Sequence, residues 1–473
     1  MADLQTNLQR LENNSDEILS LVDDISDAIV AKGGTVPANT GLRGFVNAIN
    51  SIPSGGGGGS HPRKDVNFYD YDGTVVQSYS ATDFANLTAL PANPSHIGLT
   101  SQGWNWSLAD AKSYVADYGS LNVGQMYITS DGKTRLYISL PEGRTSPILQ
   151  LYLNDNSELD IDWGDDGTHS TFTTTSAEYK SERHEYSSSG DYVIAITVVN
   201  GGFALQSSST TVSTILWNGN NNENSPDKAY NNTIKKIEIG GGVTSIGNYA
   251  FKGCSSLSSI TIPDGVTTIG GNAFLLCYSL SSITIPDTVT SIGTSTFYQC
   301  YSLSSIAIPD RVTTIGGNAF TRCSSLSSIT IPDGVTSIGQ YAFYNCYSLS
   351  SIAIPDSVTS IGNSAFLLCY SLSSVTIPNT VTSIDDNAFR YCSSLSSVTI
   401  PDSTTSIGNE TFSMCEYMES IKFTSATPPT VSSSSAWYKL PTSCTIYVPS
   451  ESLNAYKTAT NYPNPSTYTY VGY

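Results

Sequence analysis

Apolar and polar residues recur every 23 residues through the second half of the chain. Each unit reads C-x-x-L-x-x-I-x-I-P-D-x-V-T-x-I-G-x-x-A-F-x-x. Within 259–262 polar and apolar residues alternate, as in a half-buried strand, and Pro263-Asp264 ends that strand. A fixed period of ~20–50 residues is typical of a solenoid, whose stacked copies bury one another's apolar faces. The pattern therefore predicts a β-solenoid over 232–423, in a multidomain chain that is mainly β.

Eight of the nine cysteines follow this period, and so does one phenylalanine in each unit. These residues predict ladders of like side chains inside the solenoid. Side chains in a parallel ladder point in the same direction, so we expect buried thiols rather than disulfides between coils. We expect no metal site, because the repeats contain no C-x-x-C pair and no histidine. The ladder cysteines are Cys254, Cys277, Cys300, Cys323, Cys346, Cys369, Cys392 and Cys415.

Near the N-terminus, residues 4–29 carry apolar side chains at alternating steps of four and three, with Ser15 as one polar break. This is the seam of a coiled coil, and it predicts a homo-oligomerisation stalk at 1–30, with a trimer favoured. A single amphipathic helix packed on a neighbouring domain is the alternative. A short helical segment at 31–54 and a Gly-rich linker at 55–64 follow. The seam residues are Leu4, Leu8, Leu11, Ile18, Val22, Ile25 and Ile29.

Between this linker and the solenoid, the pattern predicts a small α+β module at 65–145. Its predicted elements are a hairpin at 66–79, a helix near 107–118, and strands near 123–129 and 133–140. A Ser/Asn-rich linker at 218–231 leads into the first coil.

The segment 424–473 is predicted to cap the C-terminal end of the solenoid, because the last coil needs a cover for its core. In this cap we expect a strand at 443–449 and a helix at 451–459, with Ser450 as the helix cap. A closing strand is expected to hold Tyr468, Tyr470 and Tyr473.

Charge and composition narrow the range of partners. The chain has 473 residues with 40 acidic and 21 basic side chains, a net charge of −19. This balance excludes nucleic acid, whose binding needs basic surfaces, and it opposes binding to an anionic membrane. No apolar run approaches the ~18 residues of a spanning helix, so we expect no membrane insertion. The first residues lack the basic and apolar regions of a signal peptide, so we expect no secretory leader.

The chain offers little catalytic chemistry. Its sequence contains no nucleophile-elbow, phosphate-loop, zinc-protease or dinucleotide motif, so we expect no enzyme and no cofactor. The four histidines, His61, His96, His169 and His184, lie outside the repeats, and we expect His184 to be packed and hydrogen-bonded. The paired carboxylates at 160–166 sit beside glycines and are expected to be turn residues, with calcium binding left open.

Variable positions of the repeat supply the candidate ligand-binding residues. Equivalent positions align along a solenoid, and the residue after Cys is tyrosine in four units, which predicts a stripe of rings. Tyrosine suits recognition because it offers a large contact area at low entropy cost. The alternative is that the rings only cover the hydrophobic edge of the adjacent coil. The candidates are Tyr278, Tyr301, Tyr347, Tyr370, Tyr298, Tyr344, Arg322 and Arg390.

The repeat unit resembles the BspA-type leucine-rich repeat, a family of bacterial surface and adhesion proteins, over about 232–423. The clearest departures from the family pattern are Asp385 in place of Gly and Thr404 in place of Val. In that family the repeat cysteine is a small buried ladder residue.

Two further resemblances concern the chain before the solenoid. Residues 146–217 resemble a PKD-like β-sandwich through Asp162-Trp163-Gly164-Asp165-Asp166-Gly167, His184-Glu185-Tyr186 and Gly190-Asp191-Tyr192. Such modules act mostly as spacers or adhesive units. The motifs Val66-Asn67-Phe68-Tyr69-Asp70-Tyr71-Asp72-Gly73-Thr74 and Gln102-Gly103-Trp104-Asn105-Trp106-Ser107 are similar to a module of phage and prophage tail proteins.

These features predict a non-enzymatic bacteriophage tail fibre or baseplate appendage that recognises the host surface through its leucine-rich repeats. The resemblance implies tail or baseplate proteins as partners, and a bacterial surface protein or glycan as the ligand. It also implies a location in the virion tail, after assembly in the host cytoplasm. A bacterial cell-surface adhesin and a purely structural tail spacer are the alternatives.

Overall fold

The computed structural model describes residues 66–69, 75–95, 99–104, 108–118, 121–129, 131–143, 145–165, 167–206, 215–217 and 233–473. All of them belong to one compact unit, Lys64–Tyr473. The predicted stalk with its seam residues, the helical segment at 31–54 and the linkers at 55–64 and 218–231 lie outside these residues. Among the described residues, no helix has the length and apolar character needed to cross a membrane.

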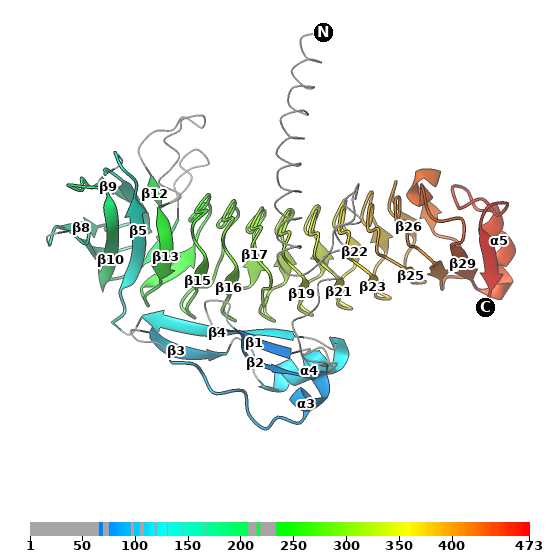
Figure 1. Ribbon diagram of the computed structural model, residues 1–473, viewed down its shortest axis with the longest axis horizontal. Coiled ribbons are helices and arrows are strands. Elements are labelled where there is room, and N and C mark those ends of the chain that lie inside the picture. The colour runs from blue at the N-terminus through cyan, green and yellow to red at the C-terminus, as the bar shows by residue number, and fades with distance from the viewer. Residues whose placement is uncertain are drawn as a thin grey trace, which may run out of the picture. The chain divides into compact units, whose positions relative to one another are not determined.

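The C-terminal part of the chain is a β-solenoid, so the predicted mainly β fold with 23-residue repeats is confirmed (Figure 1). Equivalent residues of successive coils pair in parallel register, for example Ile329 with Ile352 in one sheet and Ile338 with Ile361 in the other. One set of strands contains β15 (Ser259–Thr261), β16 (Ser282–Thr284), β19 (Ser328–Thr330), β21 (Ser351–Ala353), β23 (Ser374–Thr376), β25 (Ser397–Ile400) and β27 (Ser420–Phe423). The other contains β14 (Val243–Ile246), β17 (Ser291–Ile292), β18 (Thr314–Ile315), β20 (Ser337–Ile338), β22 (Ser360–Ile361), β24 (Ser383–Ile384), β26 (Ser406–Ile407) and β28 (Thr430–Val431).

Ladders of identical buried side chains join the coils. The repeat phenylalanines form one column from Phe251 to Phe412, fully buried, with successive ring centroids 5.3–5.6 Å apart. Each cysteine thiol from Cys277 to Cys415 donates to the carbonyl of a phenylalanine in the preceding coil, at 3.1–3.3 Å. The predicted free thiols are confirmed, since all nine cysteines are buried and unbridged. A single coil could not bury these groups, so each coil depends on its neighbours.

The strand column continues beyond Phe423, where the sequence period ends. Strands β29 (Thr445–Val448) and β30 (Thr469–Gly472) pair in parallel with β27 and with each other. Trp437 stacks on Phe412 with centroids 5.7 Å apart, so it extends the phenylalanine column by one ring. The predicted closing strand is confirmed for Tyr470, while Tyr468 and Tyr473 flank it.

The prediction that Ser450 caps a helix is wrong. Residues Ser450–Ser452 form a short 3-10 helix, η3, and helix α5 (Leu453–Thr458) begins after it. The Ser450 hydroxyl donates to the Tyr473 carbonyl at 3.1 Å, so it fastens the C-terminal strand instead. A second short 3-10 helix, η2, spans Ser434–Trp437.

A β-sandwich precedes the solenoid and shares both of its sheets with the first coils. One sheet has the order β16-β15-β13-β5-β10-β7-β8, and the other contains β12-β6-β11-β14, with β9 paired to β6. The strands of the sandwich and first coil are β5 (Thr134–Leu140), β6 (Ile148–Leu153), β7 (Glu158–Asp162), β8 (His169–Thr173), β9 (Glu178–Arg183), β10 (Gly190–Asn200), β11 (Phe203–Leu205), β12 (Leu216–Trp217) and β13 (Ile234–Glu238). The sandwich and the solenoid therefore have one continuous hydrophobic core.

Strand β5 joins the two parts. The sequence pattern assigned residues 133–140 to the preceding α+β module, but β5 pairs antiparallel with β10 on one side and with β13 of the solenoid on the other. Alternate residues of β5, among them Leu136 and Ile138, are buried in the shared core. The alternation of apolar and polar residues predicts that β5 is a strand, but it does not show that β5 pairs with β10 and β13.

The N-terminal module is a four-stranded sheet of order β2-β1-β4-β3. The predicted hairpin is confirmed by the antiparallel pair β1 (Val66–Tyr69) and β2 (Val75–Tyr79), and the predicted helix by α4 (Leu108–Tyr118). Strand β4 (Leu121–Thr129) pairs in parallel with β1, while β3 (Leu99–Trp104) and the short helix α3 (Ala81–Ala85) were not predicted. Phe68, Phe84 and Trp104 pack in its own small core.

A fragment that begins at residue 233 should be unstable, because it leaves the β13 edge and the apolar end of the core uncovered. A fragment of residues 131–473 keeps β5 and the sandwich, and should be monomeric with a cooperative thermal transition. We expect the shorter fragment to aggregate on size-exclusion chromatography or to melt at least about 10 °C lower, as loss of several buried side chains implies. Equal behaviour of the two fragments would show that the shared sheets are not required for folding.

Candidate functional site: the tyrosine side of the solenoid

One turn of each coil carries the candidate residues, and its backbone places them. Two residues in this turn adopt positive φ, as Tyr341 at 56° and Asn345 at 62° do on either side of Phe343. The cysteine that follows points inward, and the next residue points outward. Hydrogen bonds between coils keep these turns in step, for example from the Ser371 amide to the Tyr347 carbonyl at 3.3 Å.

The structure places Tyr278, Tyr301, Tyr347 and Tyr370 in one exposed column, which we call the tyrosine stripe. Their exposed fractions are 40%, 38%, 44% and 38%, so each residue is more than half covered and still presents part of its surface to solvent. The stripe consists of two stacked pairs. Tyr278 and Tyr301 have centroids 5.2 Å apart and planes 9° apart, and Tyr347 and Tyr370 have values of 5.8 Å and 20°. Ser324 occupies the same position in the coil between the pairs.

Further aromatic residues surround the second pair. Tyr344 packs edge-on against Tyr341, with centroids 5.7 Å apart. The Asn345 side-chain amide donates to the Tyr347 hydroxyl at 2.9 Å. Burial raises the pKa of Tyr370, and the neighbouring Tyr347, Tyr391 and Tyr344 raise it further, which indicates that these phenols lie close together.

The two candidate arginines have different surroundings. Arg390 forms an ion pair with Glu410, donates to Asn387 at 3.2 Å and lies 5.2 Å from the Tyr391 ring centroid, so internal contacts hold it. Arg322 is half-buried, and its Nε has no hydrogen-bond partner. Tyr298, the remaining candidate, is half-buried in the turn two coils before Tyr344.

The outward face of the β15–β27 strand column, which carries Ser or Thr in most coils, is only partly accessible. Thr261, Ser282 and Thr284 in the first coils are 4–8% exposed, because β4 contacts β15 and β16. In later coils the equivalent Ser351 and Ser374 are exposed. Any contact of this face with a ligand is therefore restricted to the later coils.

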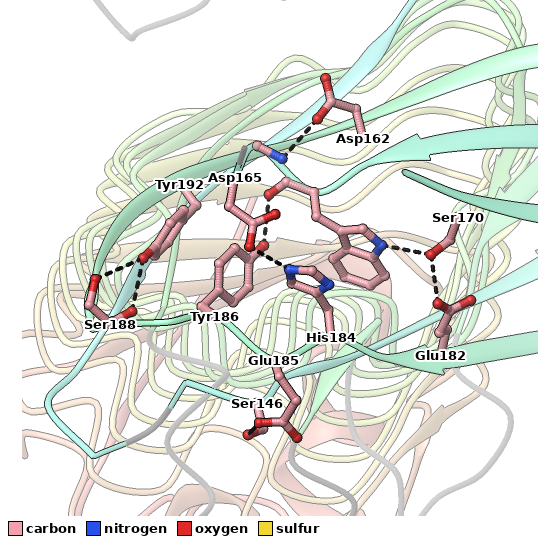
Figure 2. Close-up of polar contacts among 12 residues, drawn as sticks. Ser146, Asp162, Asp165, Ser170, Glu182, His184, Glu185, Tyr186, Ser188 and Tyr192 are labelled. Carbon is pink, nitrogen blue, oxygen red and sulfur yellow. Dashed lines mark hydrogen bonds and ion pairs between the residues drawn. The ribbon is translucent and has the colours of Figure 1, made fainter. Parts of the chain in front are cut away.

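Figure 2 shows a polar cluster in the sandwich that contains His184. The His184 ring stacks on Trp163 with centroids 4.6 Å apart, and its Nε2 lies 2.7 Å from Asp165 Oδ2. The Tyr186 hydroxyl donates to the Trp163 carbonyl, and the Trp163 indole donates to Ser170, both at 2.9 Å. The prediction that His184 is packed and hydrogen-bonded is confirmed.

Asp162 and Asp165 act in turns as predicted, whereas the prediction is wrong for Asp160, which lies within strand β7. Asp162 Oδ1 accepts from the Gly164 amide at 2.9 Å, and Gly164 has φ +77°. A Cβ at Gly164 would lie 2.4 Å from the Val193 carbonyl oxygen, so only glycine fits there. Asp160 is paired with the exposed His169 at 2.9 Å. Within the described residues no group of three metal-ligating side chains comes together; Asp166, His61 and His96 lie outside them.

Comparison with known proteins identifies the repeat. Residues 225–350 and 336–459 match the family described as BspA type leucine rich repeat region. The solenoid belongs to the BspA-type leucine-rich repeat family. No curated protein matches the chain.

Several solved leucine-rich repeat proteins are similar to part of this chain. A leucine-rich repeat protein from Bacteroides ovatus is 30% identical with a TM-score of 0.36, and the match covers 45% of this chain and 60% of that one. A T. pallidum leucine-rich repeat protein is 29% identical with a TM-score of 0.32, covering 41% and 85%. A leucine rich cell surface protein from Faecalibacterium prausnitzii is 28% identical with a TM-score of 0.27, covering 50% and 84%. This chain thus spans less than two thirds of the Bacteroides protein.

The cysteines of the BspA-type ladder should resist thiol reagents. Burial raises the pKa of the Cys369 thiol from an ordinary value of 9.0 to about 12, and it raises the pKa of every other ladder thiol from Cys277 onward. The native protein should show no fast reaction with Ellman's reagent at pH 8, and nine thiols should react in guanidinium. The thiol pKa is higher in the folded protein than in the unfolded chain, so the unfolded chain loses its thiol protons first as pH rises. The stabilisation from burying neutral thiols is therefore complete below about pH 9 and is lost as pH rises toward 12. Fast labelling of the native protein at pH 8 would contradict the ladder.

Proposed function

We propose that this chain is a non-enzymatic recognition protein whose leucine-rich repeat solenoid binds a bacterial surface ligand through the tyrosine stripe. The observation that supports this proposal is the pair of exposed tyrosine stacks on a backbone fixed by buried ladders. Exposed aromatic rings gathered on one surface are characteristic of interaction sites.

Preorganisation supports a binding role for this side of the solenoid. Tyrosine loses little side-chain entropy on binding, and a ring already stacked on its neighbour loses less still. The stripe itself contains no charged side chain, although the chain carries a net charge of −19. A neutral aromatic and hydroxyl surface suits a glycan or a polar protein surface.

For the biological setting, we propose a bacteriophage tail fibre or baseplate appendage located in the virion. The tail-like motifs at 66–74 and 102–107 and the heptad pattern at 4–29 support it. A trimeric stalk that binds tail or baseplate proteins would present several solenoids at once, which multiplies weak contacts into strong attachment.

The second candidate is a bacterial cell-surface adhesin. Membership of the repeat in the BspA-type family, which contains bacterial surface and adhesion proteins, favours this setting. Both settings use the same binding surface, so the test of the stripe applies to either.

Replacing Tyr278, Tyr301, Tyr347 and Tyr370 with serine should weaken binding of the labelled full chain to intact bacterial cells at least tenfold. The loss of several aromatic contacts explains this magnitude. The variant should fold, because Ser255, Ser324 and Ser393 occupy the same position in other coils. Flow cytometry across a panel of candidate hosts measures the effect.

The matched control is Tyr438→Ser, which removes a tyrosine that is 53% exposed and lies outside the stripe. This variant should bind cells as the unmodified chain does. If the stripe variant also binds normally, the stripe is not the recognition surface. If the unmodified chain binds no cells in the panel, the recognition role is wrong and the spacer alternative is favoured.

A further inference from the structure

We propose that the gap at Ser324 in the tyrosine stripe is a binding slot for one pyranose ring of a surface glycan. This inference rests on the proposed recognition function and specifies its ligand. The slot is bounded by Tyr301 and Tyr347, and Arg322 lies two residues before Ser324 in the coil between them.

The stacking of the tyrosines decides which ring faces are open. Within each pair, the two facing surfaces cover each other at centroid distances of 5.2 and 5.8 Å. Only the outer faces of the pairs remain available to a ligand. The outer faces of Tyr301 and Tyr347 both border Ser324, whereas Ser393 has a tyrosine on one side, Tyr370, and Glu416 on the other. The Ser324 position is therefore bounded by two aromatic walls.

The width of the slot follows from the coil spacing. Tyr301 and Tyr347 are two coils apart, and strands stack at ~4.8 Å, so the two walls are about 10 Å apart. Carbon atoms in contact lie ~3.5–4.0 Å apart, so a flat aromatic ring between two walls needs only ~7–8 Å. A pyranose chair with hydrogens on both faces is thicker and fills the larger gap. The Ser324 hydroxyl lies against the preceding coil, 3.4 Å from the Tyr301 carbonyl, and leaves the space open.

Arg322 supplies a hydrogen-bond donor at this coil. It occupies the repeat position of Asn345, whose amide donates to the Tyr347 hydroxyl two residues further on. The residue two positions after Arg322 is Ser324, which has no phenol to accept such a bond. Within residues 233–473, the Arg322 guanidinium has no hydrogen bond and no ion pair, and its Nε is buried without a partner.

These groups match the chemistry of a sugar ring. A pyranose presents C–H groups on its two faces and oxygen atoms around its rim. The faces would lie on the two tyrosine rings, and rim oxygens would accept from the guanidinium. Hydroxyl and carboxylate oxygens both serve as acceptors, so neutral sugars and uronic acids share this chemistry.

The test compares two variants that place a tyrosine at equivalent positions. Ser324→Tyr should fill the slot and continue the stack, and it should fold because tyrosine occupies this position in four other coils. Ser393→Tyr is the control, since it adds the same ring beside only one wall. The full chain is applied to an array of O-antigens, capsular polysaccharides, teichoic acids and peptidoglycan fragments, and affinities for the captured glycan are measured by calorimetry.

We expect at least one glycan to bind, Ser324→Tyr to weaken that binding at least tenfold, and Ser393→Tyr to leave it within twofold. Arg322→Leu, the residue found at positions 276 and 368, should weaken it at least threefold, and more for a uronic acid than for a neutral sugar. Periodate treatment of cells should abolish binding, and protease treatment should preserve it.

Several outcomes would overturn the slot. They are the absence of any bound glycan, normal binding by Ser324→Tyr, equal weakening by both tyrosine variants, and cell binding that resists periodate but is lost after protease treatment. If the four-serine stripe variant still loses cell binding in any of these cases, the proposed function stands without the slot. If neither Ser324→Tyr nor the four-serine stripe variant changes cell binding, both the slot and the proposed function fail.

Discussion

Every coil of the solenoid is stabilised by its contact with the next coil. A 23-residue coil has too little apolar surface to fold alone. The stacking of the phenylalanine rings and the hydrogen bonds from thiols to carbonyls form only between coils. Removal of one buried phenylalanine typically costs ~3–5 kcal/mol, which is comparable with the whole stability of a small domain. The ends of the column therefore need covers. The sandwich supplies one through β5 and β13, and Trp437 begins the other.

The same stacking creates the candidate binding surface. Each repeat cysteine faces the core, so the residue after it faces solvent. Because the coils repeat, these outward residues align in one column along the solenoid. The identity of the residue after each cysteine therefore determines the order of side chains along this column. Two tyrosine pairs and one serine gap are the result here, and the backbone that carries them is held by hydrogen bonds between coils.

The periodic sequence determined much of this account, and non-periodic contacts determined the rest. Ladder residues, strand registers and unbridged cysteines followed from a constant period, because each coil repeats the environment of the last. The pairing of β5 with β13 could not be predicted, since it joins segments about 100 residues apart with no shared pattern. The strands after Phe423 were predicted as a cap, but their pairing with the solenoid strands was not, because the spacing lengthens there and Trp437 replaces phenylalanine.

The candidate site was predicted in outline only. The four stripe tyrosines were visible as a repeat position, but their grouping into stacked pairs required side-chain geometry. Arg390 was a candidate by position alone, and its ion pair with Glu410 gives it an internal partner. Ser324 carried a signal that sequence reasoning passed over, namely a small residue between two tyrosines of the same column.

Hydroxyl-radical footprinting of the full chain, with and without isolated bacterial envelopes, shows whether the tyrosine stripe is covered on binding. Radicals oxidise exposed tyrosine rings, so mass spectrometry reports each ring separately. We expect severalfold less oxidation of Tyr278, Tyr301, Tyr347 and Tyr370 in the bound state, while Tyr438 and Tyr473, which are 53% and 50% exposed, stay unchanged. Unchanged oxidation of the four stripe tyrosines in the bound protein would contradict the proposed binding role of the stripe.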